Sequence, residues 1–232
     1  MLTKIQEKIL HQANLKTAIS DQRFFKEPIK TRGIRVPAVK RLAHGYFKHI
    51  DPMDKASVFA LCEDLMQTGW QEEFLIACEF SHRMRGRFVQ SDFKIFEKWI
   101  HTYVDNWAKC DTFCNHTMGA LIEKFPVVIC EIKKWTMSES RWVRRAAAVS
   151  FIIPARAGKF LDDVFEISDL MLADKDDMVR KGYGWALKVA GMSQPKKVYD
   201  FAIARVKKMP RTAYRYAIEK LPADMRIAAM KL

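Results

Sequence analysis

The chain has 232 residues, of which 49% are hydrophobic and 12% aromatic, and its formal net charge is +13. This length and composition predict a globular protein with a substantial buried core and exclude a disordered tail. No apolar run approaches the roughly 20 residues that a membrane-spanning helix requires, so we expect no membrane insertion.

The first residues, MLTKIQEKILHQ, are amphipathic and lack the continuous apolar region and small-residue cleavage site of a secretory signal. The five cysteines are odd in number and form no CxxC pair, which fits reduced thiols. We therefore expect a cytoplasmic protein without disulfides.

The predicted elements are helices throughout the chain. Between sparse glycines and prolines, apolar residues recur at spacings of three and four, and alternation with period two is scarce. No linker divides the chain, so we expect a single domain over residues 1–232. The expected helices span Thr3 to Ala18, Val36 to Phe47, Asp54 to Gln67, Glu72 to Arg83, Asp92 to Ile100, Asn106 to Lys124, Val127 to Thr136, Arg141 to Ile153, Leu161 to Leu172, Met178 to Ala190, Lys196 to Lys208 and Thr212 to Lys220.

Two of the expected helices resemble each other. VRRAAAVSFI begins at Val143 and VRKGYGWALK at Val179, 36 residues later, and further steps of 36 back reach Trp107 and Gln71, near the starts of two other helices. A period of roughly 35 to 47 residues is typical of HEAT-like solenoids. The alternative is a generic helical bundle in which V-R-x-A is a common amphipathic phrase.

The helix expected over residues 106–124 begins with NWAKCDTFC and sets Trp107 and Asp111 one turn apart. At helical spacing with apolar neighbours, a tryptophan is usually a core residue. The carboxylate is less usual there, because its burial costs free energy unless it is paired or lies at the edge of a cleft. Two interpretations stay open for Asp111: a catalytic group, or a structural ion pair with Lys109 or an arginine of the next repeat.

Three arginines occupy the start of the helix expected over residues 141–153. Arg141 and Arg145 share one flank, and Arg144 lies further round. Cations at a helix N-terminus oppose the helix dipole, so a partner outside the helix is expected. Phosphate fits because guanidinium binds it in a bidentate manner, and the alternative is a solvated basic face near Glu139. The expected buried face of this helix comprises Trp142, Ala146, Val149 and Ile153.

In the helix expected over residues 178–190, Trp185 lies away from the face expected to be buried and shares its side with Lys181 and Lys188. Such a tryptophan suits a phosphate-binding surface, where its ring can lie against sugar or base. The alternative is a tryptophan that covers a repeat junction beside the lysine stems. The buried face is expected to comprise Val179, Gly182, Tyr183, Ala186 and Ala190.

The C-terminal part has the strongest basic character. Residues 141–232 hold 19 Lys/Arg against 10 Asp/Glu, a net charge of +9 that leaves +4 for the first 140 residues. Such charge concentrates polyanions, and nucleic acid is the expected partner ahead of an anionic membrane. The segment KKMPRTAYR, residues 207–215, is either a further contact to the nucleic-acid backbone or a soluble terminal cap.

Other site types have little support. Cys110, Cys114 and His116 match no usual zinc spacing, and small apolar cysteines are ordinary core residues. There is no HExxH motif, no serine elbow, no GxGxxG and no Walker loop. We expect neither a metal nor a cofactor.

With these residues in place, the chain resembles the AlkD-like DNA glycosylases, a family with HEAT-like repeats, from about Phe24 to Leu221. The resemblance is most specific at Trp107 and Asp111 in NWAKCD, at Arg145 in RWVRRAA and at Trp185 in GYGWALK, in the order and at separations that the family shows. RGIRVP also resembles the family's G-I-x-x-P turn. Two positions depart from some members, which have tyrosine in place of Phe24 and glutamine in place of Arg35.

The resemblance implies an all-α fold, a right-handed superhelical α-solenoid with a concave basic surface. It implies a monomeric DNA glycosylase that removes positively charged alkylated purines from double-stranded DNA during base excision repair. Asp111, Trp107 and Trp185 would be catalytic. The DNA would be bound by Arg145, Arg141, Arg144, Lys181, Lys188, Arg35 and Phe24.

Two other functions stay open. Some relatives bind branched DNA without glycosylase activity, so the alternative is a non-catalytic HEAT-repeat protein that binds branched or damaged DNA. The second is a protein-interaction scaffold whose cations meet acidic partners.

Overall fold

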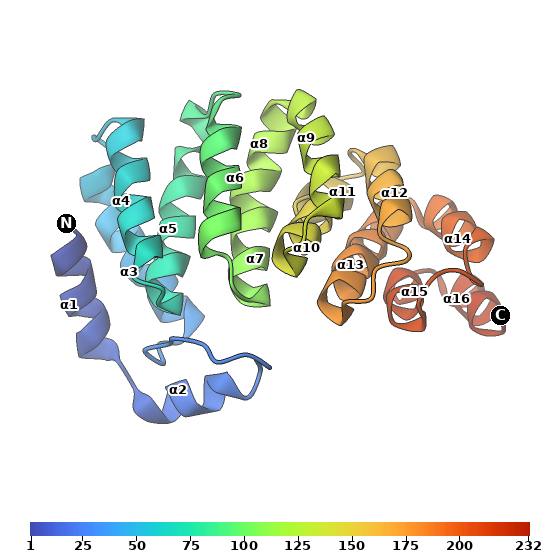
Figure 1. Ribbon diagram of the computed structural model, residues 1–232, viewed down its shortest axis with the longest axis horizontal. Coiled ribbons are helices and arrows are strands. Elements are labelled where there is room, and N and C mark those ends of the chain that lie inside the picture. The colour runs from blue at the N-terminus through green and yellow to red at the C-terminus, as the bar shows by residue number, and fades with distance from the viewer. The chain divides into compact units, whose positions relative to one another are not determined.

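We describe all 232 residues in a computed structural model, which is helical throughout and contains no strand. The all-α prediction is confirmed. The chain divides into two units, Met1–Phe113 and Cys114–Leu232, and each is described by itself (Figure 1). None of the helices combines the length and apolar character needed to cross a membrane.

The first unit is built around α5, which packs against α3, α4 and α7. A cluster of aromatic rings joins α4, α6 and α7, with Phe96 in contact with Phe59, Trp99 and Phe113 at centroid distances of 5.4, 5.6 and 5.6 Å. The helices of this unit are α1 (Leu2–Gln12), α2 (Leu15–Gln22), α3 (Val36–Ile50), α4 (Lys55–Gln67), α5 (Gln71–Arg83), the 3-10 turn Met84–Arg87, α6 (Asp92–Tyr103) and α7 (Trp107–Phe113).

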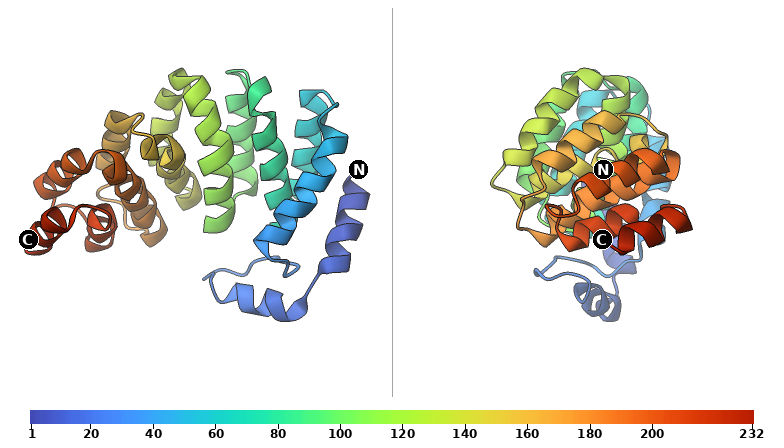
Figure 2. Two further views of the ribbon diagram at one scale, coloured as in Figure 1. Left: turned by 180° about the vertical axis from the view of Figure 1, so that it is seen from behind. Right: turned by 90° about the vertical axis from the view of Figure 1, so that its right-hand side faces the viewer.

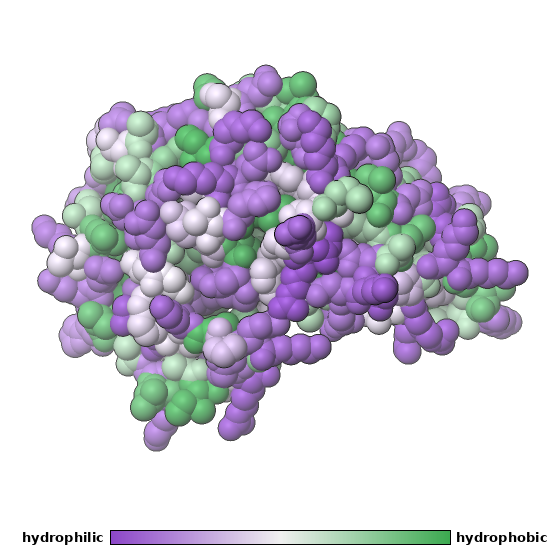
Figure 3. All heavy atoms as spheres, in the orientation of Figure 1, coloured by the Kyte–Doolittle hydropathy of each residue, from purple (hydrophilic) through white to green (hydrophobic).

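Helix α2 differs from its neighbours because none of its residues is buried. It lies crosswise to α3–α6 and apart from them, as Figure 1 and the reverse view in Figure 2 both show. Leu15 and Ile19 are 76% and 57% exposed, and Figure 3 shows hydrophobic atoms gathered over this helix. The N-terminal end of the first unit therefore presents apolar side chains to solvent.

The second unit is organised around α13, which packs against α10, α11, α12, α14 and α15. Its helices begin with the π-helical turn Cys114–Met118 and continue as α8 (Gly119–Lys124), the 3-10 turn Pro126–Val128, α9 (Ile129–Lys134), the 3-10 turn Trp135–Met137, α10 (Arg141–Val149), α11 (Ile152–Arg156), α12 (Leu161–Leu170), α13 (Asp177–Ser193), α14 (Pro195–Ala204), α15 (Arg211–Ile218) and α16 (Ala223–Met230).

Small residues on α13 let its neighbours approach closely. A Cβ added to Gly184 would lie 2.8 Å from Cβ of Tyr216 and 3.0 Å from the carbonyl oxygen of Ala213, both on α15. A Cβ on Gly182 would lie 3.1 Å from Cγ of Arg145, on α10. Real Cβ atoms are rarely this crowded, so the packing of α13 depends on these glycines.

Side-chain hydrogen bonds between distant parts of the chain recur at a sequence separation close to 36. In the first unit Asn106 bonds to Gln71 across 35 residues and Lys55 to Asp92 across 37. In the second unit Lys159 bonds to Glu123 across 36 residues. This recurrence within each unit agrees with the 36-residue period that the sequence predicts.

Most predicted helices are present, with several differences. The helix expected over residues 3–18 is two helices, because Asn14 caps α2 by accepting a hydrogen bond from the Thr17 amide at 3.0 Å. The helix expected over residues 141–153 ends at Val149, so Ile153 is 38% exposed and not on the buried face. Helix α16 was not predicted.

The buried face expected for α13 is confirmed at Val179, Gly182, Tyr183, Ala186 and Ala190. The helix expected over residues 106–124 contains a π turn at Cys114–Met118, and the boundary between the units falls where that turn begins. All five cysteines are free thiols, and four of them are buried. The single domain and the right-handed superhelix with a concave basic surface stay predictions.

Candidate functional site

The indole of Trp107 lies at the surface of the first unit and is only half-buried. It stacks on the ring of Phe25, with centroids 5.1 Å apart and planes inclined by 17°. Its Nε1 donates a hydrogen bond to the carbonyl oxygen of Phe24 at 3.4 Å. The ring is therefore less buried than a core tryptophan would be. The ring is fixed from one side by the chain that follows α2.

The start of α7 is anchored to α5 by buried polar groups. Asn106 caps the helix by accepting from the Lys109 amide at 3.0 Å and donates from Nδ2 to Oε1 of Gln71 at 3.1 Å. Lys109, only 2% exposed, pairs through Nζ with Asp105 at 2.8 Å and donates to the carbonyl oxygen of Gly69 at 3.3 Å. The ammonium group predicted as a possible partner of Asp111 is thus directed to Asp105.

Asp111 lies one helical turn after Trp107 on α7, so the two side chains share a face of the helix. Its side chain is half-buried. A carboxylate in this setting keeps access to a ligand while the protein excludes part of the solvent that would screen its charge. It can therefore stabilise a positive charge brought up beside the indole.

The segment that supports Trp107 is itself held by the side chain of Gln22. Its Nε2 donates to the carbonyl oxygen of Glu27 at 2.9 Å, and its Oε1 accepts from the Ile29 amide at 2.9 Å. These bonds fold residues 23–29 into a closed turn. Phe24 points outward from this turn and is 71% exposed, so its ring is available to a partner.

The chain between this turn and α3 is held by a buried carboxylate at the start of α5. Glu72, 1% exposed, accepts from the hydroxyl of Thr31 at 2.8 Å and from the amides of Arg32 and Ile34 at 2.9 and 3.1 Å. Gly33 has φ of 76°, and a Cβ there would lie 2.1 Å from the carbonyl oxygen of Asn14. The turn therefore requires glycine at this position.

Glu73 lies beside this anchor and is fully buried. It pairs with Arg32 at 3.2 Å, while its Oε2 and the Nε of Arg32 have no hydrogen-bonding partner. Burial raises the pKa of the Glu73 carboxyl, because the charged form loses hydration that a single ion pair does not replace. The guanidinium of Arg32 also stacks over Trp70 at 3.6 Å.

Cations surround the exposed Phe24 in sequence. All of them are exposed, and none forms an ion pair within the protein: Lys16, Arg23, Lys26, Lys30 and Arg35. Arg35, a predicted DNA contact, stands at the N-cap of α3 with its side chain in solvent. These residues are free to meet phosphate without first leaving a protein partner.

In the second unit, Arg145 is buried, with only 5% of its surface exposed. Its Nη1 donates a hydrogen bond to the carbonyl oxygen of Met178, and its stem packs against Gly182 on α13. The residue therefore fastens α10 to the N-terminal half of α13. Its predicted contact with phosphate stays a prediction.

The other two arginines of α10 have carboxylate partners before α13. Arg144 pairs with Asp174 at 2.6 Å and also donates to the carbonyl oxygen of Ser138 at 2.8 Å. Arg141 pairs with Asp176 at 3.4 Å, and Asp176 caps α13 by accepting from the Met178 amide at 2.8 Å. The partner that a helix N-terminus rich in arginine requires is thus supplied by the protein itself.

Trp185 lies on α13 outside the buried face, as the helical wheel predicts, and is half-buried. Lys181 pairs with Asp177 at 2.7 Å, and Lys188 pairs with Glu219 at 2.7 Å with its ammonium 5.7 Å from the centre of the Tyr216 ring. Both lysines predicted to bind DNA therefore have acidic partners within this unit.

The structure brings Trp107 together with Phe24 and sets Asp111 beside it, and it joins Arg145 to the helix that carries Trp185. Sequence reasoning missed Phe25, which provides the stack under Trp107. The Phe24–Phe25 pair was a signal of an aromatic contact, but the sequence of a loop does not tell which ring faces inward. It also missed Glu72. An acidic residue in the first turn of a helix is common because it interacts favourably with the helix dipole, so the position of Glu72 in α5 did not indicate a further role.

One family model matches nearly the whole chain. A family model described as "DNA alkylation repair enzyme" matches residues 5–221. Among solved structures, a predicted DNA alkylation repair enzyme from Enterococcus faecalis is similar to this chain with a TM-score of 0.81 and 18% sequence identity, covering 91% of this chain and 98% of the other. No curated protein matches the sequence.

Proposed function

This chain belongs to the family of DNA alkylation repair enzymes, and from that premise we propose that it is a DNA glycosylase that removes positively charged alkylated purines from duplex DNA. The family assigns it an enzymatic role in the repair of alkylated DNA, with DNA as its partner. The proposal adds the reaction, the substrates of the 3-methyladenine and 7-methylguanine type, and the residues that act on them.

The chemistry follows from the charge of the substrate. A purine alkylated at N3 or N7 is cationic and is already a good leaving group, so no general acid is needed. The bond between C1′ and the purine breaks with its electron pair going to the base, which leaves neutral. Water forms the new bond to C1′, and its proton passes to solvent. The enzyme has to stabilise the positive charge that develops on the sugar and position the water.

Asp111 and Trp107 are suited to these two tasks. The Asp111 carboxylate attracts the oxocarbenium-like sugar and accepts a hydrogen bond from the attacking water. The ring of Trp107 offers its negative face to the same cation. Because Phe25 and the Phe24 carbonyl fix that ring, little reorganisation is required when the substrate binds.

The remaining predicted residues are assigned to holding DNA. Trp185 would pack on a deoxyribose, and Arg145 with Arg141, Arg144 and the two lysines of α13 would contact phosphates. Glycosylases usually flip the base into a pocket. The family resemblance implies instead a surface that engages the DNA backbone and leaves the lesion exposed or stacked. We infer that the lesion is processed without a base pocket, as a monomer and in the cytoplasm.

The observation that carries the proposal is the half-buried, stacked Trp107 one helical turn from the half-buried carboxylate of Asp111. A core tryptophan beside a structural ion pair would be enclosed on both faces. Here Phe25 covers one ring face, and the indole as a whole is only half-buried.

The test is the release of free base from methylated duplex DNA. The wild-type protein should release 3-methyladenine and 7-methylguanine, and Asp111→Asn should lower the rate by about 10²- to 10³-fold, because it removes the charge that stabilises the sugar cation. A matched control is Asp64→Asn, an exposed carboxylate on α4, which should leave the rate unchanged.

The outcomes separate the proposal from its alternatives. Tight binding to branched or damaged DNA with no base release by an excess of wild-type protein would favour the non-catalytic DNA-binding protein. Weak DNA binding with no release would favour the protein-interaction scaffold. Release that Asp111→Asn does not change would contradict the role assigned to this carboxylate.

A further inference from the structure

The stretch from the last turn of α14 to the end of α15 is basic and contains no acidic residue. Residues 201–218 contain five Lys/Arg and no Asp/Glu, between Asp200 and Glu219. Arg205 is bonded to Asp169, and Glu219 is taken by Lys188. The four other cations are exposed and form no ion pair: Lys207, Lys208, Arg211 and Arg215. We call these four residues the C-terminal cationic segment.

Several other lysines of the unit, in contrast, have a carboxylate partner. Lys133 lies 2.6 Å from Glu166 and 2.8 Å from Asp163, and Lys134, Lys159 and Lys196 each lie within 2.9 Å of a carboxylate oxygen. A paired cation can bind phosphate only after it loses that partner, whereas the C-terminal cationic segment has no such cost.

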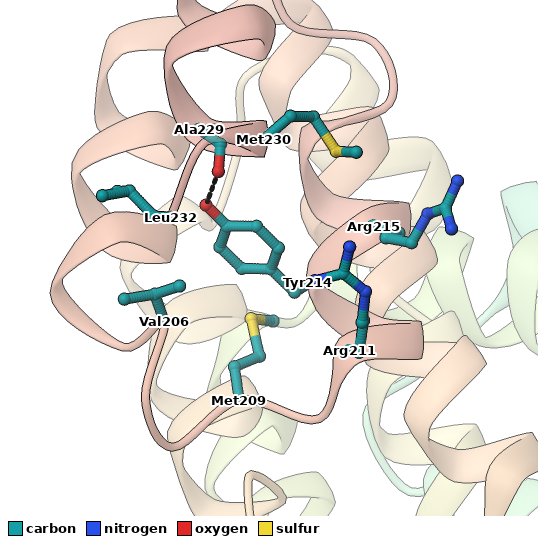
Figure 4. A pocket seen from close by; sticks show the side chains of 8 residues that line it. All are labelled: Val206, Met209, Arg211, Tyr214, Arg215, Ala229, Met230 and Leu232. Atoms are coloured by element: carbon teal, nitrogen blue, oxygen red, sulfur yellow. Dashed lines mark hydrogen bonds between the residues drawn. The ribbon is translucent and has the colours of Figure 1, made fainter.

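The segment is held rigidly from beneath. Met209 and Tyr214 are 5% exposed, and the Tyr214 hydroxyl donates to the carbonyl oxygen of Ala229 in α16 at 2.9 Å. Figure 4 shows Tyr214 at the centre of the small cavity, with Arg211 and Arg215 both on one side of its ring. The two arginines are one turn apart on α15 and share a face. Cations on such an anchored surface lose less freedom on binding than cations on a mobile tail.

The chemistry favours a repeated anion over a small ligand. The cavity of about 90 Å³ is too small for a nucleotide, whose site would need roughly 300 Å³ or more. Four like charges without acids repel one another, and an array of phosphates relieves this repulsion while releasing counterions. DNA, the partner of the family, is such an array.

We propose that the C-terminal cationic segment is a second DNA-backbone contact, which binds phosphates of the duplex independently of the base that is repaired. Its partner is the phosphate backbone without regard to sequence or lesion. The proposal rests on DNA as the partner and not on glycosylase activity, so undamaged duplex is the substrate for its test and base release is not needed.

The experiment measures the affinity for an undamaged duplex at increasing salt. The quadruple variant Lys207→Gln, Lys208→Gln, Arg211→Gln, Arg215→Gln removes up to four contacts, each worth about 0.9 in the slope of log K against log salt. When the salt concentration rises from about 50 to 200 mM, the affinity of both proteins for DNA falls. The fall should be roughly 10²-fold smaller for the quadruple variant than for the wild type. A matched variant with the same change in charge replaces the paired residues Lys133, Lys134, Lys159 and Lys196 by Gln and should keep most of the wild-type slope.

A second measurement uses the wild-type protein and does not depend on the folding of any variant. Duplex DNA should protect Lys207 and Lys208 from acetylation and leave Lys134 and Lys159 as reactive as in the free protein. Equal salt slopes for the two quadruple variants, or unprotected Lys207 and Lys208, would overturn the proposal. So would binding of the segment to vesicles of phosphatidylcholine and phosphatidylserine that duplex DNA does not displace, because the surface would then serve a membrane.

Discussion

In the first unit the basic residues around Phe24 form no ion pair, whereas in the second unit the cations of α10 and α13 that are predicted to bind DNA already have partners within the protein. Lys16, Arg23, Lys26, Lys30 and Arg35 all project into solvent. In the second unit, Arg141, Arg144, Lys181 and Lys188 are each paired with a carboxylate, and Arg145 is buried. The second unit therefore has the larger net charge, but more of the side chains that are predicted to bind DNA there are already paired with carboxylates of the protein.

The difference teaches that net charge and available charge are separate quantities. The net charge of +9 over residues 141–232 still attracts DNA from a distance. A cation that is paired with a carboxylate has to break that ion pair before it can bind phosphate. Only the structure shows which cations are paired in this way. In the first unit two buried acids have other partners: Glu72 accepts hydrogen bonds from backbone amides, and Glu73 pairs with the side chain of Arg32.

The largest expected effect follows from removing the anchor of the first unit. Glu72→Ala leaves three donors without their acceptor in a buried position and should lower the free energy of unfolding by about 3 kcal/mol or more. Chemical denaturation measures this loss. The control is Glu79→Ala on the same helix, which removes a partly exposed pair with Lys40 and should cost less than about 1 kcal/mol. Equal losses for the two variants would show that Glu72 is not the anchor.

The next effect tests how the second unit holds the helix that carries Trp185. Gly184→Ala forces a methyl group against Tyr216 and the backbone of Ala213 and should destabilise the protein by about 1–3 kcal/mol. Gly45→Ala, inside α3 with no atom within 4 Å of the new Cβ, should be neutral or stabilise by about 0.5–1 kcal/mol. Thermal unfolding compares the two. A Gly184→Ala protein as stable as Gly45→Ala would contradict the close packing of α13 and α15.

Much of the fold was accessible from the sequence, because helical periodicity is a local signal. The repeat of 36 residues between Val143 and Val179 was also readable, and it recurs in the hydrogen bonds of both units. The environment of Trp107 was not, because its partners Phe24 and Phe25 lie about 80 residues earlier in a loop whose side-chain directions no periodicity predicts. The break at Asn14 was missed although asparagine is a good N-cap, since the apolar spacing continues across it.

A smaller effect sharpens the contrast between paired and free cations. Asp177→Asn releases Lys181 from its partner and removes a negative charge, so the affinity for undamaged duplex should rise several-fold, on the order of 1 kcal/mol, if Lys181 contacts phosphate. Asp200→Asn is the matched control, because it frees Lys196 from the same kind of pair four residues along a helix. Fluorescence anisotropy gives both affinities. Identical gains would mean that only the overall charge matters.

The smallest expected effect is a pH dependence that belongs to the first unit. Because burial raises the pKa of Glu73, the folded protein keeps this proton at pH values where the unfolded chain has lost it. The contribution of Glu73 to the free energy of unfolding is fully present below the ordinary carboxyl pKa of about 4.5. It is lost as the pH rises through the higher pKa that Glu73 has in the folded protein. Glu73→Gln should remove this decline in denaturation experiments at successive pH values. A wild-type curve that rises relative to the variant over this range would give the opposite sign.

The most direct test of the assignment of catalysis to Asp111 and of DNA binding to the C-terminal cationic segment measures the rate of base release and the affinity for DNA on the same proteins. With a duplex that contains one 7-methylguanine, single-turnover release should fall about 10²- to 10³-fold in Asp111→Asn, while its affinity for undamaged duplex is unchanged or higher. The quadruple variant of the C-terminal cationic segment should bind more weakly and release base at the wild-type rate once saturated with DNA. An Asp111→Asn protein that keeps its release rate, or loses it only in proportion to weaker binding, would contradict the assignment of catalysis to this carboxylate.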